Sequence, residues 1–113
     1  PAPIAAEDAA PFLGSYVYST REAGDTTPPS TITLTHENGM LIAHWAPAPD
    51  PELASFVLIR LKDDWFIMGI LRSGTIYDVF EDEVFEFSRT SGKVTGFELR
   101  GRADKLEGVG ERR

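Results

Sequence analysis

The sequence has no cysteine, which excludes a disulfide framework, a thiolate nucleophile and a cysteine metal site. Long apolar runs are missing too, because each is interrupted within about ten residues. A membrane-spanning helix requires roughly 20. No segment keeps the period of a long helix. The opening PAPIAAEDAAP carries acids and no basic region, so it does not resemble a signal peptide and leaves the compartment open. We therefore predict a chain without membrane insertion and without long helices.

Positive charge is scarce, since 11 basic residues face 18 acidic ones and the net charge is −7. A negative surface field repels phosphate groups, which argues against nucleic acid or an anionic membrane as the main partner. The acids concentrate in DVFEDEVFE, residues 78–86. We interpret this stretch as a solvated connection and strand face, because its spacing does not fit a calcium-binding EF-hand loop.

Turn signals divide most of the chain into short β-rich runs. We expect strands at residues 13–20, 30–36, 40–46, 54–61, 64–71, 83–89, 93–101 and 105–111, with a weaker one at 75–79. This pattern predicts an all-β fold, an eight-stranded antiparallel up-and-down barrel. Residues 12–113 would form this single domain. Residues 1–11 read as a proline-bracketed linker in which one helical turn fits around Ala5–Ala10, and we expect this segment to contribute little to a core.

The first hairpin has a register that its turn specifies. In TITLTHENGMLIAHW the turn is Asn38-Gly39, the strongest short-range hairpin signal. A two-residue loop pairs Glu37 with Met40 and directs the apolar face of the hairpin inward. The two histidines, His36 and His44, then lie on opposite faces, so we expect them not to share a metal ion.

The second hairpin, FEFSRTSGKVTGFELRG at residues 85–101, allows two registers. A three-residue loop ending at Gly92, with this glycine in the left-handed region, sets Phe85 against Phe97. It also opposes Asp82 to Arg100 on the other face, a favourable cross-strand pair. A two-residue turn would mix the apolar and polar faces, so we predict the three-residue loop.

Self-contained catalytic signatures are missing. A Ser-His-Asp triad would need a histidine beside a serine elbow, and no G-x-S-x-G occurs. The predicted register makes Glu86 and Glu98 diagonal neighbours about 7–8 Å apart, a spacing that suits acid–base pairs. They share a polar face without a cleft, however. The glycines of EGVGERR are expected to ease close packing at a closing strand. We predict no catalytic, cofactor-binding or metal-binding residues and no cofactor.

Aromatic side chains are spread over most of the expected strands. In a small closed barrel such side chains either fill the interior or line a ligand cavity, and a filled core is the default expectation. The residues that would line a cavity are Trp45, Phe56, Trp65, Phe85, Phe87 and Phe97.

Several stretches together resemble a known domain. FLGSYVYS after a Pro/Ala-rich segment, ENGMLIAHW, DDWFIMG and the second hairpin are similar to the lipocalin-like C-terminal domain of certain serine hydrolases. These belong to the β-lactamase and penicillin-binding-protein group, including D-aminopeptidase-like and esterase-like members. The resemblance covers residues 12–111. It implies a lipocalin-like barrel that packs on a catalytic domain, upstream in the same polypeptide or in the same complex.

The catalytic motifs of that group do not carry over. No serine is followed three positions later by lysine, and the Tyr-x-Asn and Lys/His-x-Gly elements are absent. The nearest look-alike, residues 93–96, lies on the second hairpin. The resemblance therefore implies a barrel that is not an enzyme by itself, and that shapes access to another active site or mediates oligomerisation.

Two other functions remain open from the sequence. One is a stand-alone barrel that binds an apolar small molecule among Trp45, Trp65, Phe85 and Phe97. The other is a small barrel enzyme, such as an isomerase or cyclase, with carboxylates inside. The predicted register puts only one acid, Glu83, on the side of the inward phenylalanines.

Overall fold

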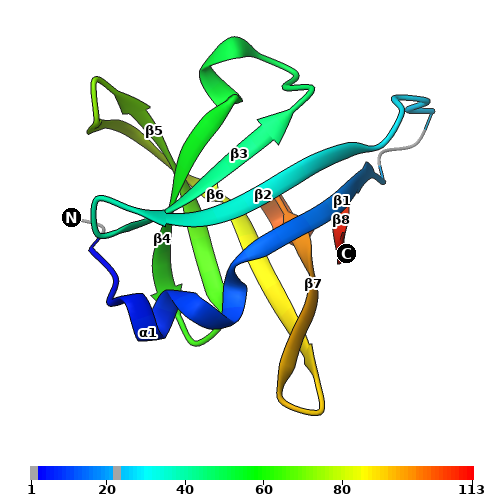
Figure 1. Cartoon of the computed structure of the whole chain (residues 1–113). Helices are drawn as coiled ribbons and strands as arrows, with labels where there is room; N and C mark the ends of the chain where they lie inside the picture. Colours follow the sequence, from blue (N-terminus) through cyan, green and yellow to red (C-terminus); the bar gives the residue numbers. More distant parts are fainter. Residues whose placement is uncertain (1–2, 22–23) are drawn as a thin grey trace.

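The computed structural model describes residues 3–21 and 24–113 and shows a closed barrel of eight antiparallel strands (Figure 1). Each strand pairs with the next one in the chain, and β8 pairs with β1. The strands are β1 (Gly14–Thr20), β2 (Ser30–Glu37), β3 (Met40–Ala46), β4 (Ser55–Lys62), β5 (Trp65–Arg72), β6 (Thr75–Thr90), β7 (Lys93–Arg100) and β8 (Leu106–Arg112). This arrangement confirms the all-β, up-and-down, lipocalin-like barrel.

Alternating side chains build a single core inside the barrel. On β1, for example, Tyr16 and Tyr18 are buried while Val17 between them is not, as the two-residue period of a strand requires. The largest fully buried side chains of this core come from most of the strands and from the N-terminal segment: Tyr16, Phe12, Phe56, Phe66, Phe85, Ile32, Leu41 and Leu58.

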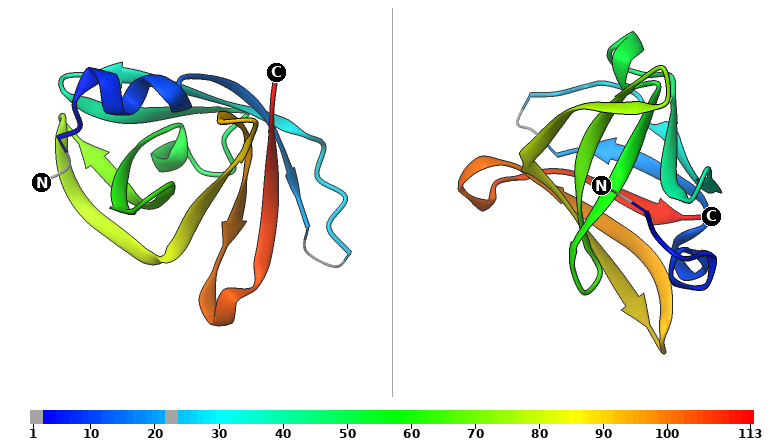
Figure 2. Two further views of the ribbon diagram at one scale, coloured as in Figure 1. Left: turned by 90° about the horizontal axis from the view of Figure 1, so that it is seen from below. Right: turned by 90° about the vertical axis from the view of Figure 1, so that its left-hand side faces the viewer.

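The predicted strands 75–79 and 83–89 are one continuous strand, β6, of 16 residues. Its pairing with β5 is interrupted, because Met68 pairs with Phe80 while the preceding Ile67 pairs with Val84. Residues 81–83 therefore form a bulge in β6, and bulges bend a strand and increase its twist. Figure 2 shows the resulting curvature of this strand, drawn in yellow-green to yellow.

The first hairpin has the predicted register. Glu37 pairs with Met40 across the Asn38-Gly39 turn, and both turn residues have positive φ, 51° and 76°. Positive φ at both positions is the signature of the type I′ turn, whose twist matches that of the flanking strands.

The predicted register of the second hairpin is wrong by two residues along most of its length. Phe97 lies opposite Phe87 and not Phe85, and Arg100 lies opposite Val84 and not Asp82. The turn has two residues, Ser91 and Gly92, with φ of 53° and 81°. The pairing then shifts by one residue after Ser88. This bulge returns the phenylalanines of both strands to the same face, which a two-residue turn alone would not do.

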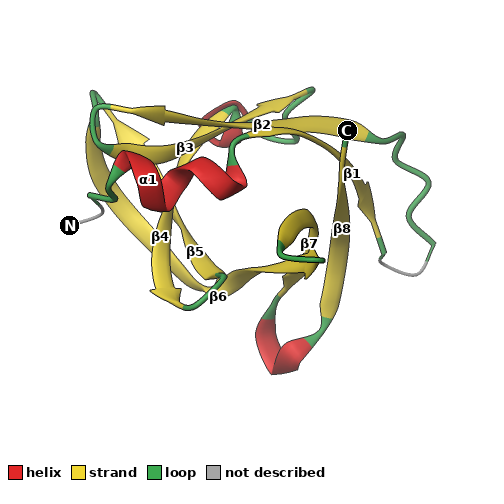
Figure 3. Cartoon of the chain, turned by 60° about the horizontal axis from the view of Figure 1, so that its bottom comes forward, coloured by secondary structure: helices red, strands yellow, loops and turns green. Residues whose placement is uncertain are grey.

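The N-terminal segment covers one end of the barrel and begins with a short helix (Figure 3). α1 (Ala6–Ala9) continues into the 3₁₀ turn η1 (Ala10–Phe12), so the expected helical turn is present. The expectation that residues 1–11 contribute little to the core is wrong. Ala9 is completely buried, Ile4 packs against the core, and the Ile4 N–H donates to the Gly39 carbonyl at 2.8 Å.

Two further 3₁₀ turns lie at the opposite, open end. η2 (Pro51–Leu53) connects β3 to β4, and η3 (Arg102–Asp104) connects β7 to β8. Because the strands run up and down, these connections and the one between β1 and β2 share that end, away from α1.

Candidate functional site

The centre of the barrel is filled by aromatic rings. Phe56, Phe85, Phe87 and Phe97, four of the predicted cavity residues, are all buried. The ring of Phe97 lies 5.2 Å from that of Phe85 and 5.3 Å from that of Phe87, centroid to centroid. Phe12 of the N-terminal segment packs edge-on against Phe87 at 5.1 Å. These are normal distances for packed aromatic pairs. The four phenylalanines fill the barrel rather than line a chamber.

The open end of the barrel retains a small cavity. Two adjoining hollows of about 290 and 220 Å³ share the side chains of Tyr18 and Trp45. The two rings pack edge to face at 5.3 Å, and the indole N–H of Trp45 donates to the Ser30 hydroxyl at 2.7 Å. Glu83 lines the smaller hollow together with Phe80. Glu83, the acid that the sequence analysis placed on the inner side, therefore lies at the open end of the barrel, which we call the mouth, and away from the packed centre.

Trp65 lies on the outer surface with 36% of its area exposed, so its prediction as a cavity residue is wrong. Its neighbour Phe66 takes the inward position and is completely buried. Successive residues of a strand point to opposite faces, and an inward Phe66 therefore turns Trp65 outward. The Lys62 ammonium lies over the exposed indole at 4.6 Å.

The paired carboxylates form part of an ion cluster on the outside of the barrel. Glu86 lies directly opposite Glu98, not diagonally as predicted, because the hairpin register differs. Arg100 joins them: its guanidinium is 2.7 Å from Glu98 and 3.8 Å from Glu86. Burial raises the pKa of Glu86, while the charge of Arg100 counteracts that rise. The shared guanidinium balances the two carboxylates, and this arrangement fits an outer-surface ion pair better than an acid–base couple.

The two histidines lie on opposite faces of their hairpin, as predicted. His36 Nε2 is 2.8 Å from the Ile4 carbonyl at the end of the barrel that α1 covers. His44 lies on the outer face, with Nδ1 3.0 Å from Ser55 Oγ and Nε2 2.5 Å from Glu37 Oε2.

Ser55, His44 and Glu37 have the composition of a catalytic triad, and the sequence analysis missed this group. Its members come from three strands, and the pairing of His44 with Ser55 across β3 and β4 brings them together. Hydrogen bonds from Thr35 and His44 lower the pKa of Glu37. The His44 and Glu37 side chains are 43% and 46% exposed. Triad catalysis depends on a water-excluded site with donors for an oxyanion. This exposed chain of hydrogen bonds fits a link between three strands.

An apolar groove, which we call the outer groove, crosses the outside of the barrel over β3 to β6. It has a volume of about 770 Å³ and is lined by Pro3, Asn38, Met40, Ile59, Ile67, Gly74, Thr75, Ile76, Val79 and Glu81. Beneath it, Ile42 and Val57 form a second apolar cluster and are nearly inaccessible. The sequence signal was present in the unbroken apolar runs MLIA and FVLI. Such runs indicate strands covered on both faces.

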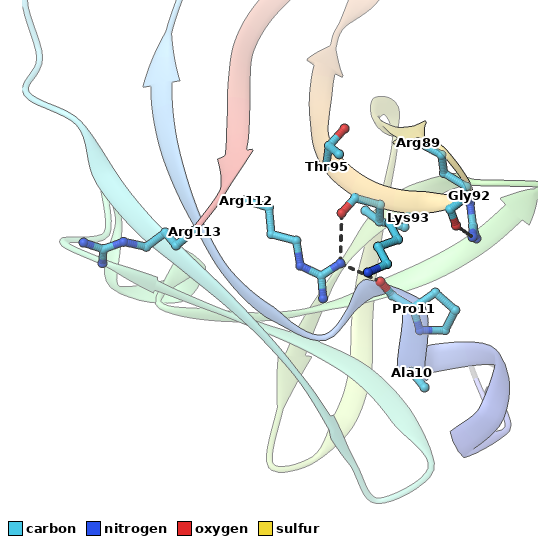
Figure 4. A pocket seen from close by; sticks show the side chains of 9 residues that line it. Ala10, Pro11, Arg89, Gly92, Lys93, Thr95, Arg112 and Arg113 are labelled. Carbon is cyan, nitrogen blue, oxygen red and sulfur yellow. Dashed lines mark hydrogen bonds between the residues drawn. The ribbon is translucent and has the colours of Figure 1, made fainter.

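A basic pocket of about 620 Å³ lies at the covered end and includes Arg89, Lys93, Arg112 and Arg113. Figure 4 shows Arg112 and Lys93 extending toward Pro11, while Arg113 points away. The Arg112 guanidinium donates to the carbonyls of Pro11 at 2.9 Å, of Val94 at 3.0 Å, and of Leu13. Its donors are thus used to fasten the N-terminal segment to β7.

Residues 3–21 and 24–113 contain neither a group of metal-ligating side chains nor a helix that could span a membrane. Within these ranges, no three His, Cys, Asp or Glu side chains are grouped so that they could hold a metal ion. In the same part of the chain, no helix has the length and apolar character needed to cross a membrane. Comparisons with protein-family models, with curated proteins and with solved structures found no match to this chain.

Proposed function

We propose that this barrel is a non-catalytic, lipocalin-like accessory domain of a serine hydrolase of the β-lactamase and penicillin-binding-protein type. It would pack on the catalytic domain and shape access to the active site or hold subunits together. The observation that carries the proposal is the filled core. Among the described residues no charged side chain is buried, and the buried Tyr16 hydroxyl donates to the Phe12 carbonyl, so the packed centre offers no carboxylate or histidine for acid–base catalysis.

The outer groove supports the same proposal. Barrel strands usually present polar side chains to solvent, whereas β4 and β5 present Ile59 and Ile67 to this groove. Exposed apolar patches of this kind mark contact surfaces. A catalytic domain seated on the groove would bury these side chains.

The proposal can be tested in an extract of the source organism. The extract is treated with a fluorescent penicillin and with a fluorescent fluorophosphonate, both of which label active-site serines, and is then separated on native and denaturing gels. An antibody raised against the barrel should detect a labelled species on the native gel. On the denaturing gel, label and antibody coincide if the two domains share one polypeptide. An antibody-reactive species that neither reagent labels on the native gel would refute the proposal.

A matched pair of variants then tests the groove in the assembled protein. Ile59→Lys puts a charge into the outer groove, and Leu61→Lys puts the same charge at an exposed position outside it, where the leucine is 55% accessible. We expect the first variant to loosen the contact and change the hydrolase KM or oligomeric state, while the second leaves both unchanged. Equal effects of the two variants would contradict a role for the groove.

The mouth cavity favours a second candidate function, binding of a small apolar molecule. Tyr18 and Trp45 offer ring surfaces in hollows of about 290 and 220 Å³, which suit a ligand of a few carbon atoms better than a lipid chain. Native mass spectrometry of protein purified from its source tests this candidate. A retained ligand that Trp45→Ala releases would support it, and an unliganded mass would count against it.

A further inference from the structure

The first part of β6, residues 75–80, is paired along one edge and open along the other. Thr75–Phe80 pair with residues 68–72 of β5, but pairing with β7 begins only at Val84. Across the described chain, no backbone–backbone hydrogen bond outside the β5 ladder involves residues 75–80. Among the backbone N–H groups of this stretch, that of Val79 donates to a side chain, Asp78 Oδ1 at 2.9 Å. This stretch therefore presents strand backbone with room for another neighbour.

Apolar side chains stand exposed along the same edge. Tyr77 is 63% accessible, and Val79 and Phe80 are each 37% accessible. Unpaired edges are templates for strand addition, and proteins commonly protect them with charges and bulges. This edge combines accessible backbone with accessible aromatic and aliphatic side chains, as strand-accepting edges do.

Negative charge surrounds the edge. Asp78 lies within it, and the bulge that follows contributes Glu81, Asp82 and Glu83. A hollow of about 570 Å³ beside the strand is lined by Val79, Phe80, Glu81, Asp82, Glu83, Arg102 and Glu107. Arg102 is the one basic residue among them, and it is already paired with Asp82 at 3.0 Å. A second copy of this edge would bring the same acids face to face, so charge disfavours pairing between two copies.

We propose that residues 75–80 of β6 accept an extended, positively charged peptide segment of a partner protein as an additional strand. Main-chain hydrogen bonds to the open edge would supply affinity, and lysine or arginine side chains would pair with Asp78 and Glu81. Apolar residues of the segment would contact Val79 and Phe80. The proposal does not depend on a hydrolase, but a domain seated on the outer groove would compete with the peptide for Val79 and Glu81, which line both surfaces.

The pairing pattern limits the length of the added strand. The register shifts between Ile70 and Leu71, opposite Tyr77, and again at the bulge of residues 81–83. Bulges interrupt regular pairing. The segment should therefore span about six residues, from the β5–β6 turn to the bulge of residues 81–83, with its pairing interrupted at Tyr77.

The test uses the whole chain labelled with ¹⁵N and three blocked synthetic hexapeptides. The probe has the order Lys-Lys-Val-Val-Lys-Lys, so that each face of the added strand carries both lysine and valine. The second peptide has glutamate in place of lysine, and the third repeats the probe with N-methylated central residues. The probe should shift the amide resonances of residues 75–80 and slow their hydrogen exchange. The glutamate peptide should not bind because of its charge. The N-methylated peptide should not bind because it lacks the required donors.

Two protein variants separate local recognition from general attraction to an acidic surface. Asp78→Lys with Glu81→Lys should weaken binding of the lysine peptide roughly tenfold or more, because two favourable contacts become repulsive. Asp8→Lys with Glu111→Lys makes the same change in net charge at exposed positions elsewhere, and should leave affinity within about twofold. The amide resonances of both variants should be as widely dispersed as those of the wild type, which shows that the variants fold.

Three results would overturn the proposal. One is the absence of binding at millimolar concentrations of the probe. Another is equal binding of the N-methylated peptide, which would show attraction without strand addition. The third is a response that is not local to the edge, seen either as an equal loss of affinity in both double variants or as resonance shifts without a maximum at residues 75–80.

Discussion

Tyr16 connects the N-terminal segment to the barrel through a single hydroxyl group. Its O–H donates to the Phe12 carbonyl at 2.8 Å, and Arg112 lies over its ring at 5.7 Å. Burial raises the pKa of Tyr16 from its ordinary 10.0 to about 12, although the charge of Arg112 acts in the opposite direction. The residue thus keeps its proton in the folded protein at pH values where an unfolded chain would lose it.

This shift predicts an alkaline loss of stability. The contribution is complete below pH 10.0, where both states are protonated, and it declines from pH 10.0 to about 12, because only the unfolded state is then ionised. Urea midpoints measured across this range should fall in the wild type. Tyr16→Phe should lower the midpoint at neutral pH, where a hydrogen bond worth about 1 kcal/mol is lost, and should show a weaker alkaline decline. Tyr77→Phe, at a 63% exposed site, is the control and should keep the wild-type pH dependence.

Gly110 faces the ring of Phe97 so closely that a side chain does not fit. A Cβ atom at this position would lie 2.1 Å from Cε2 of Phe97. Gly110→Ala should therefore force the ring to move and cost about 1–3 kcal/mol of unfolding free energy, measurable by urea denaturation. Val109→Ala, at the partly exposed neighbouring position, should cost less. A neutral Gly110→Ala would mean that the ring has space to rotate away.

The sequence predicted some of these residue-level features and not others. The glycines of EGVGERR were expected to permit close packing at the closing strand, and the structure confirms this at Gly108 and Gly110. The backbone conformation of Ser91 was harder to predict, because its φ is 53° and glycine or asparagine is the usual residue at such a turn position. The two-residue turn was rejected because it would mix the apolar and polar faces, and the sequence did not reveal the bulge after Ser88 that keeps them apart.

At the scale of elements, Arg112 of β8 fastens the N-terminal segment in place. Its three carbonyl acceptors belong to Pro11, Leu13 and Val94. Arg112→Met removes these bonds, each of which is worth about 1.5–3 kcal/mol when the donor is charged. We expect this substitution to accelerate hydrogen exchange, relative to the wild type, in α1 and η1 and to leave exchange in β4 nearly unchanged. Arg112→Lys should restore only part of the protection, since a lysine lacks the planar fork of donors. Exchange that accelerates equally throughout the barrel would indicate a global effect instead.

Strands were more predictable than their connections. Alternating patterns located the strands because side-chain direction in a strand follows directly from sequence position. The union of residues 75–79 with 83–89 escaped prediction, because the acids between them look like a loop while the structure places them in a bulge of one strand. The packing of Ala9 and Ile4 escaped for another reason. Small residues between prolines give little local signal, and their burial depends on the barrel beneath them.

At the scale of the whole molecule, the packed centre predicts selectivity by size. The hollows at the mouth have volumes of about 290 and 220 Å³, and the rings below them close the path inward. A fluorescent long-chain fatty acid should show no saturable binding and should leave the fluorescence of Trp45 unchanged. Serum albumin under the same conditions is the positive control. One-to-one binding with quenching of Trp45 would mean that the centre opens.

Barrel closure was predictable because the number of strands and their short turns leave few other all-β arrangements. The location of the candidate surfaces was not. The outer groove and the open edge of β6 both depend on where strands bend, and the sequence fixes neither the bulge at residues 81–83 nor the shift at Ile70. Trp65 was misplaced for the same reason, since one step of register decides whether a ring is inside or outside.

The division of β6 into two halves also has an evolutionary consequence. From Val84 onward the strand contributes buried phenylalanines to the core, so substitutions there are constrained by packing. Most of residues 75–83 are exposed, and this half can change its charge or shape with little effect on folding. Deep mutational scanning should therefore record a step in tolerance near Val84. Within one continuous strand, the mostly exposed residues 75–83 can therefore change the surface that contacts other molecules, while the buried residues after Val84 preserve the core.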